Sequence, residues 1–234
     1  MTSDVRDALA AALRPWRNRE ILIATHNAGK LKEWKWLLER CNNSAVGASE
    51  LFLPKPAETA TSYRGNAKIK VRSAARHLGN RQATLVLADD TGLAIDAIGG
   101  APGIHTARFA VKHGGFAGAA LELNRRLQVA ATKSTSCVYH CALSLGILSD
   151  TGWTYVDIDA QLSGTFASYG RGDSGFGFDP WFIRVGEQET FGEMTAERRD
   201  ANNHRAQAAR ALAHRLSTQA ARRDLSECFH PDGS

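Results

Sequence analysis

Apolar residues recur at helical spacing in several parts of the chain. This period predicts helices over 4–16, Lys30–Arg40, 62–78 and about 115–130. The first of these is either an added helix or an arm that is partly disordered. Between the predicted helices lie short apolar runs and alternating segments, which are typical of strands.

The strands are predicted from two kinds of pattern. Ile21–Thr25 and Thr84–Ala88 are short apolar runs of the kind that form buried strands, and the second run ends at Asp89-Asp90-Thr91-Gly92. From Cys137 to Ile147 every second residue is apolar, which predicts a long, half-exposed strand. A turn at 149–152 joins it to a second strand. Because helices and strands alternate early and a hairpin comes late, we expect an α/β fold with a mixed sheet.

The composition is that of an ordinary globular protein. The chain has 234 residues, of which 43% are hydrophobic and 23% charged. No apolar run reaches the roughly 18 residues that a membrane helix needs, and no secretory signal precedes the first predicted strand. The four cysteines form no Cys-x-x-Cys pair, which argues against a zinc site and fits a reducing compartment. We therefore expect a cytoplasmic protein without a membrane partner.

The net charge of +5 has two readings. A basic protein can bind nucleic acid, or it can hold polyanionic triphosphates in one site. Arginines are frequent toward the C-terminus, where a last helix is predicted to begin near Thr195 or Asn203. These arginines form either a binding surface or a solvated helix face followed by a tail.

The segment Thr25-His26-Asn27-Ala28-Gly29-Lys30 joins a predicted strand to a predicted helix. The start of a helix offers unpaired N–H groups and the positive end of the helix dipole, and both attract phosphate. Gly29 allows close approach of the backbone, and Lys30 adds a positive charge. The alternative is that Thr25 or Asn27 only caps the helix.

Two adjacent acids, Asp89 and Asp90, follow the second apolar run. Neighbouring carboxylates repel each other and lose hydration unless a cation lies beside them. Mg²⁺ prefers carboxylate oxygens and keeps bound water, so the pair predicts a metal site. The alternative is an exposed turn at the end of a strand.

Two further segments carry residues that could contact the flat ring of a nucleotide base. In the glycine-rich loop 169–180, Phe176 or Phe178 can stack on a base and Asp179 can accept from its N–H edge. The alternative is a hairpin loop whose aromatic rings pack into the core. On the last helix, Asn203-His204-Arg205 follows Arg199 by one turn and offers donors to a carbonyl oxygen, although such residues are often surface features.

In this order and at these separations, the segments resemble the inosine triphosphate pyrophosphatases. The family's motifs correspond here to Thr25–Lys30, Glu58-Thr59-Ala60, Asn66-Ala67, Asp89–Leu93, Gly99–Gly103, Thr106-Ala107-Arg108, Gly175–Pro180 and Asn203-His204-Arg205. The match extends over about 20–216. It divides the chain into an N-terminal helical extension (1–18), a pyrophosphatase domain (19–216) and a C-terminal tail (217–234).

Four positions depart from the family pattern. Gly65 stands where the family has glutamate, and Arg199 replaces a lysine. Asn203 replaces a serine, and Phe178 replaces a tyrosine. Because arginine and lysine differ in reach and geometry, these departures concern the substrate contacts more than the type of reaction.

The resemblance implies a fold and a mechanism. The fold is a long central mixed sheet flanked by helices, with a cleft between two lobes, usually in a homodimer. Glu58, Asp89 and Asp90 hold Mg²⁺, with Mn²⁺ as the alternative ion, and Asp90 also deprotonates the attacking water. The implied substrate-binding residues are Thr25, His26, Asn27, Ala28, Gly29, Lys30, Thr91, Phe176, Gly177, Phe178, Asp179, Arg199, His204 and Arg205.

The implied activity is hydrolysis of aberrant purine nucleoside triphosphates (ITP, dITP and XTP) to the monophosphate and pyrophosphate, which cleanses the nucleotide pool. Two other classes of function compete with it. A nucleic-acid-binding protein would explain the basic charge, but it leaves Glu58, Asp89 and Asp90 without a role, so no stable nucleic-acid partner is expected. A weakened, nucleotide-sensing relative would explain Gly65, Arg199 and Asn203.

Overall fold

A mixed β-sheet forms the centre of the molecule. The computed structural model describes residues 4–78, 85–131, 134–149 and 151–228. Its strands are β1 (Glu20–Ile23), β2 (Ser44–Gly47), β3 (Leu85–Ile95), β4 (Ala101–Pro102), β5 (Ser136–Ser149), β6 (Gly152–Phe166) and β7 (Phe182–Arg184). Its α-helices are α1 (Val5–Ala12), α2 (Ala28–Leu37), α3 (Tyr63–Leu78), α4 (Thr106–Lys112), α5 (Phe116–Val129), α6 (Ala196–Asn202) and α7 (His204–Cys228).

The order of the strands across the sheet is β2-β1-β3-β5-β6-β7, and β4 pairs with β3. The first three strands are parallel, whereas β3, β5, β6 and β7 pair antiparallel. The predicted α/β class with a mixed sheet is therefore confirmed.

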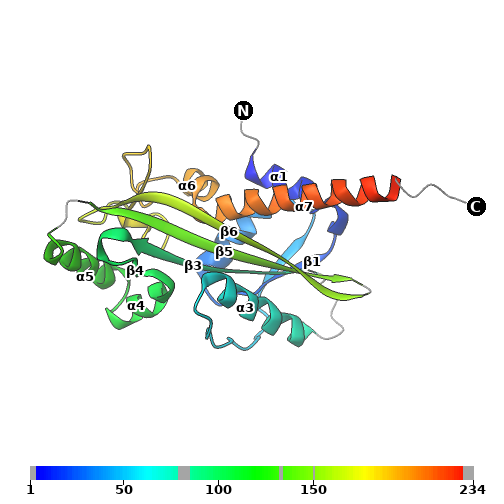
Figure 1. Ribbon diagram of the computed structural model, residues 1–234, viewed down its shortest axis with the longest axis horizontal. Coiled ribbons are helices and arrows are strands. Elements are labelled where there is room, and N and C mark those ends of the chain that lie inside the picture. The colour runs from blue at the N-terminus through cyan, green and yellow to red at the C-terminus, as the bar shows by residue number, and fades with distance from the viewer. Residues whose placement is uncertain (1–3, 79–84, 132–133, 150, 229–234) are drawn as a thin grey trace, which may run out of the picture.

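Helices cover both faces of this sheet (Figure 1). On one face, α1, α2 and α7 pack with β1, β3 and β5 around the buried Trp34. On the other face, α3 packs against β1 and β3. At one end of the long strands, α4 and α5 enclose a third cluster together with aromatic residues of the chain around β7.

The N-terminal segment is a helix rather than an arm. Val5 and Leu9 of α1 are each 1% exposed and belong to the same core cluster as α7. Helix α7 itself runs without a break from the predicted pyrophosphatase domain into the predicted tail, as far as Cys228. The two predicted starts of the last helix are both real, because Thr195 caps α6 and Asn203 precedes α7.

The prediction of a half-exposed strand at Cys137–Ile147 is wrong over its central part. Residues 141–146 of β5 are all buried. The alternation here is between large and small residues rather than between buried and exposed ones. Small side chains at Ala142, Ser144 and Gly146 let α3 close on that face, where Val71 lies 3.0 Å from the position of a Cβ at Gly146. The short helix α4 is not indicated by the sequence pattern either.

Strand β3 is longer than the apolar run predicts, and this positions the acids. The run was expected to end at Ala88, but β3 continues to Ile95 because β5 pairs with it along its whole length. On the other side, β1 pairs with Leu85–Leu87 and β4 pairs with Ala94 and Ile95. Within the described chain, no strand pairs with residues 88–93 on that side. Asp89 and Asp90 thus lie in the middle of a strand with one open edge.

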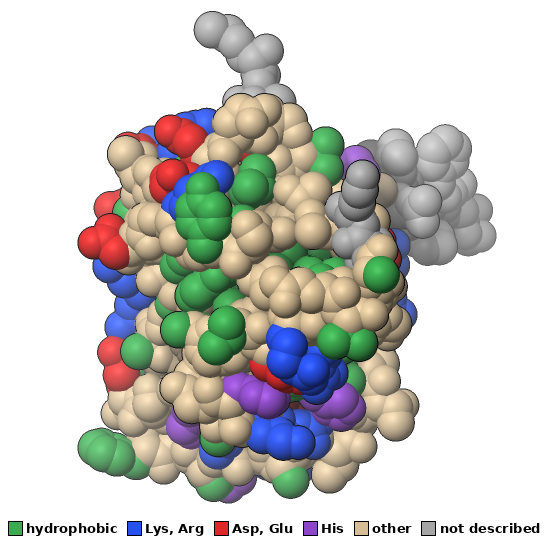
Figure 2. Space-filling model, turned by 90° about the vertical axis from the view of Figure 1, so that its left-hand side faces the viewer, with side chains coloured by type: hydrophobic (Ala, Val, Ile, Leu, Met, Phe, Trp, Pro, Cys, Tyr) green, Lys and Arg blue, Asp and Glu red, His purple; other side chains and the backbone are tan. Residues whose placement is uncertain are grey.

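The surface at the α4 and α5 end carries charges of both signs. Figure 2 shows Lys and Arg side chains interspersed there with Asp, Glu, His and apolar groups. Basic groups on this face do not form a continuous stripe. Among the residues that the structure describes, no helix has the length and apolar character needed to cross a membrane.

Candidate functional site

A cavity of about 320 Å³ lies at the open edge of β3. Most of the residues that the sequence singled out line it: Thr25, His26, Asn27, Lys30, Glu58, Asp90, Thr91, Phe176, Gly177, Phe178, Asp179, His204 and Arg205. Ala28, Gly29, Asp89 and Arg199 are not among the lining residues. The fold therefore brings five distant segments of the chain to one pocket.

The start of α2 forms one wall of the pocket. Asn27 caps the helix, since its Oδ1 accepts a hydrogen bond from the backbone N–H of Lys30 (3.1 Å). The hydroxyl of Thr25 accepts from the backbone N–H of Asn27 (3.2 Å). Capping and pocket lining are thus not alternatives at this segment, because Asn27 caps α2 and also lines the pocket. The positive end of the α2 dipole faces the cavity, which suits an anionic ligand.

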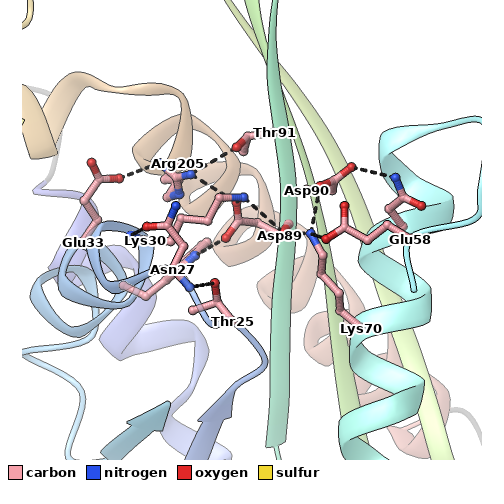
Figure 3. A network of polar contacts seen from close by, with 12 residues as sticks. Thr25, Asn27, Lys30, Glu33, Glu58, Lys70, Asp89, Asp90, Thr91 and Arg205 are labelled. Carbon is pink, nitrogen blue, oxygen red and sulfur yellow. Dashed lines mark hydrogen bonds and ion pairs between the residues drawn. The ribbon is translucent and has the colours of Figure 1, made fainter. Parts of the chain in front are cut away.

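Asp89 points away from Asp90, because successive side chains of a strand lie on opposite faces (Figure 3). Its carboxylate accepts hydrogen bonds from Lys30 Nζ (2.8 Å) and from the indole N–H of Trp34 (2.8 Å). Arg205 lies 3.3 Å from the same carboxylate. Burial raises the pKa of Asp89, but the charges of Lys30 and Arg205 outweigh it and hold this pKa well below the ordinary value.

Asp90 faces α3 on the other side of the strand (Figure 3). Its carboxylate accepts from Lys70 Nζ (2.8 Å) and from the amide of Asn66 (3.1 Å). Lys70 also lies 3.2 Å from Glu58 Oε1. Burial lowers the pKa of Lys70, but Asp90 and Glu58 raise it above the ordinary value, so the ammonium group stays charged.

The three acids that were expected around one cation divide into two groups, because Asp89 contacts Lys30 while Asp90 and Glu58 contact Lys70. Glu58 and Asp90 converge on one cation, the ammonium group of Lys70. Their hard oxygen atoms are the ligands that Mg²⁺ prefers. The oxygens of Asp89 are engaged by Lys30, Trp34 and Arg205. In the described part of the chain, no three His, Cys, Asp or Glu side chains form a group that could hold a metal ion. The two carboxylates of Glu58 and Asp90 fit a divalent cation, whereas Asp89 does not face it.

Arg205 also lines the pocket, beside His204. Its guanidinium group donates to Glu33 Oε2 (2.8 Å) and to the hydroxyl of Thr91 (3.2 Å). It also lies over the ring of Phe176, 5.4 Å from the ring centre. Among the described residues, Nε of Arg205 has no hydrogen-bond partner, although it is buried. This N–H is available to a ligand.

His204 lies beside it and is stacked on Tyr139, with ring centres 4.4 Å apart. Burial, assisted by the positive charge of Arg205, lowers the pKa of His204 well below its ordinary value, so the ring is neutral at neutral pH. Nδ1 of His204 is also buried without a hydrogen-bond partner within the described chain. A buried polar atom without a partner at a pocket wall is typical of a ligand contact.

The glycine-rich loop closes the pocket from a third side. Phe176 packs on α2, where a Cβ at Gly29 would lie 2.6 Å from its ring. Asp179 is buried and accepts from the backbone N–H of Phe176 (2.9 Å). Burial, with repulsion from Glu33, raises the pKa of Asp179 to about 7. Phe178 is 1% exposed, packs against other aromatic rings and also lines the cavity.

Arg199 does not reach the pocket. Its Nε donates to Asp200 Oδ1 (2.8 Å), and its NH1 donates to the hydroxyl of Ser174. The contact between Arg199 and a substrate stays a prediction, and in this structure the guanidinium group is engaged by Asp200 and Ser174.

Several residues of the site were not predicted from the sequence: Glu33, Trp34, Lys55, Lys70, Phe116 and Tyr139. Two local signals point to some of them. Lys70 follows Asn66 by one helical turn, and Glu33 and Trp34 follow Lys30 by one turn, so each shares a helix face with a residue of a motif. Tyr139 and Phe116 carry no such signal, because only the packing of α5 and β5 brings them to the cavity.

Known proteins resemble this chain over most of its length. The model of the Ham1 family matches residues 21–215. A dITP/XTP pyrophosphatase from Rhodopseudomonas palustris is 41% identical over 179 residues, which cover 76% of this chain and 82% of that protein. A dITP/XTP pyrophosphatase from Caulobacter vibrioides is 38% identical over 189 residues, which cover 81% of this chain and 93% of that protein. The solved structure of a HAM1 protein from Coxiella burnetii has a TM-score of 0.74 at 31% identity and covers 86% of this chain and 99% of that one.

Proposed function

The chain belongs to the Ham1 family, and on this premise we propose that it hydrolyses noncanonical purine nucleoside triphosphates (ITP, dITP and XTP) to the monophosphate and pyrophosphate. Relatives named dITP/XTP pyrophosphatase support this reaction. The observation that carries it is the joining of Glu58 and Asp90 through Lys70, opposite the start of α2, in one pocket.

The phosphates occupy the end of the pocket between α2 and α3. Thr25, Asn27 and the backbone around Ala28 and Gly29 bind them with the aid of the helix dipole. Lys30 faces the same end, and Asp89 holds its ammonium group in place. Asp89 thus acts in this proposal as a positioning residue for Lys30.

Asp90 receives the proton of the attacking water. One oxygen of its carboxylate accepts from Lys70 and the other from Asn66, so each keeps a lone pair directed elsewhere. The water oxygen forms a bond to the α-phosphorus, the bond from that phosphorus to the bridging oxygen breaks, and pyrophosphate leaves. Glu58 and Asp90 would hold Mg²⁺ or Mn²⁺, which when bound neutralises charge on the phosphates.

The base occupies the end formed by Phe176, His204 and Arg205. Hypoxanthine and xanthine carry a 6-oxo acceptor, which the unpartnered Nε–H of Arg205 can satisfy. Adenine presents an amino donor at that position and would leave the buried donor unpaired. Such a mismatch costs on the order of several kcal/mol. Phe176 stacks on the ring, and Asp179 accepts from its N–H edge.

A pyrophosphate-release assay with ITP and Mg²⁺ tests the proposal. We expect pyrophosphate rather than orthophosphate, with turnover lost in Asp90→Asn by about 100-fold or more, the usual contribution of a general base. Asp159→Asn, an exposed acid on β6, is the matched control and should turn over normally. Normal turnover in Asp90→Asn would refute the role of Asp90.

The same assay separates the competing functions. A nucleic-acid-binding protein would show salt-dependent binding to DNA or RNA without turnover. A nucleotide-sensing relative would bind ITP without releasing pyrophosphate.

Assembly as a homodimer and a cytoplasmic location also belong to the proposal, on the resemblance to the family. Light scattering of the purified protein tests the dimer.

A further inference from the structure

The glycine-rich loop that carries Phe176 needs contacts with the rest of the protein to hold a single conformation. Three of its glycines adopt positive φ: Gly172, Gly175 and Gly177. Glycine loses more conformational freedom on ordering than any other residue, so such a loop is costly to fix. Its position nevertheless decides whether Phe176 lies over Arg205 and against Gly29.

Hydrogen bonds join the first half of the loop to the chain around residue 190. Arg171 donates to Glu193 Oε2 (3.0 Å) and to the carbonyl of Gln188 (2.8 Å). The backbone N–H of Ser174 donates to the carbonyl of Gly192 (3.0 Å). These bonds fix the first half of the loop, and the contact from Phe176 to Asp179 fixes its end.

A further contact to the loop comes from helix α6. The side chain of Arg199 is 6% exposed and spans from Asp200 to the loop. Nε and NH2 of Arg199 both lie 2.8 Å from Asp200 Oδ1, which orients the guanidinium plane. The remaining nitrogen, NH1, then donates to the hydroxyl of Ser174, two residues before Phe176.

We propose that Arg199 is a positioning residue that latches the loop through Ser174 and so places Phe176 over the base end of the pocket, rather than contacting the base itself. The inference rests on the proposed function for its kinetic consequence, but the latch itself is a property of the fold. The planar guanidinium group directs Nε and NH2 to Asp200 and NH1 to Ser174, which lie in different directions from it. The single ammonium group of a lysine at this position would keep Asp200 and release the loop.

The latch predicts the same outcome for two different substitutions. Ser174→Ala and Arg199→Lys each remove the bond to the loop while leaving Asp200 a positive partner. We expect each to raise KM for ITP about tenfold, the effect of losing one charge-assisted hydrogen bond, with kcat changed less than about twofold. The double variant should match either single one, since both changes break the same bond. The ratio of activity on ITP to activity on ATP should stay at the wild-type value.

Hydrogen exchange provides a readout that does not depend on turnover. In both single variants the backbone N–H of Phe176 should exchange about tenfold faster than in the wild type, while the amides of β5 remain unchanged. Hydrogen exchange tests the contact between Arg199 and the loop even if the chain fails to hydrolyse ITP. The latch and the proposed function can therefore be refuted separately. The matched control is Ser168→Ala, since Ser168 precedes the loop and its hydroxyl makes no bond to Arg199.

Two results would overturn the latch. If Arg199→Lys changes the preference for ITP over ATP while Ser174→Ala does not, Arg199 contacts the base directly. If Ser174→Ala leaves both KM and the exchange of the Phe176 amide at wild-type values, the bond to Arg199 does not hold the loop.

Discussion

Replacing Asp179 with asparagine should make the stability of the protein less sensitive to rising pH. Asp179 is buried, and its pKa is raised to about 7 by burial and by repulsion from Glu33. In the unfolded chain the same carboxyl group titrates near pH 3.9, as an approximate reference value. Asparagine keeps an oxygen that can accept from the N–H of Phe176, but it cannot ionise.

The sign follows from the number of bound protons. Between pH 4 and pH 7 the folded protein holds a proton on Asp179 that the unfolded chain has released, so the free energy of unfolding falls as the pH rises. The stabilisation is complete below the unfolded pKa and is lost as the pH passes through the folded pKa. Each pH unit in this window costs about 1.4 kcal/mol, which gives roughly 3 kcal/mol between pH 5 and pH 8.

Guanidinium denaturation at pH 5, 6, 7 and 8 measures this effect. The wild type should lose roughly 3 kcal/mol more than Asp179→Asn over that range. The amide of asparagine needs an acceptor of its own, and any cost of burying it shifts the whole curve without changing its slope. Asp173→Asn, an exposed acid on the same loop, is the control and should follow the wild type. Parallel curves for the wild type and Asp179→Asn would mean that Asp179 does not keep its proton in the folded protein over this range.

Three further substitutions test the site and its support. In Gly29→Ala the new methyl group would lie 2.6 Å from the ring of Phe176, so the ring must move and KM for ITP should rise about tenfold. An unchanged KM would argue against Phe176 as a base contact. Leu9→Ala should lower the free energy of unfolding by about 2–5 kcal/mol in a denaturation experiment, because Leu9 is 1% exposed in the core between α1 and α7. A negligible loss would mean that the N-terminal helix does not support the fold. Glu33→Gln removes the partner of a buried arginine and should cost about 3 kcal/mol or more; a stability equal to that of the wild type would mean that Asp89 alone compensates the charge of Arg205.

The features of the fold that depend on residues close together in the chain could be predicted from the amino-acid pattern. Helix caps at Asn27, Thr195 and Asn203 are set within three residues of each cap, and the sequence identified each of these positions. The periods of apolar residues depend on one turn or one strand, so they predict the elements and the α/β class. Most pocket residues were also found, because they belong to short motifs.

The features that depend on pairing between distant segments follow only from the packing of the folded chain. The chain around Asp89 and Asp90 does not show that β5 extends β3 past Ala88, or that β1 ends early and leaves the edge of β3 open. Once these two acids lie inside a strand, their side chains must point to opposite faces, and each meets a different helix. Arg205 meets Glu33, 172 positions earlier in the chain, only because α2 and α7 pack on the same face. Local residue patterns carry no information about such contacts, since the energy that selects them comes from burying whole elements together.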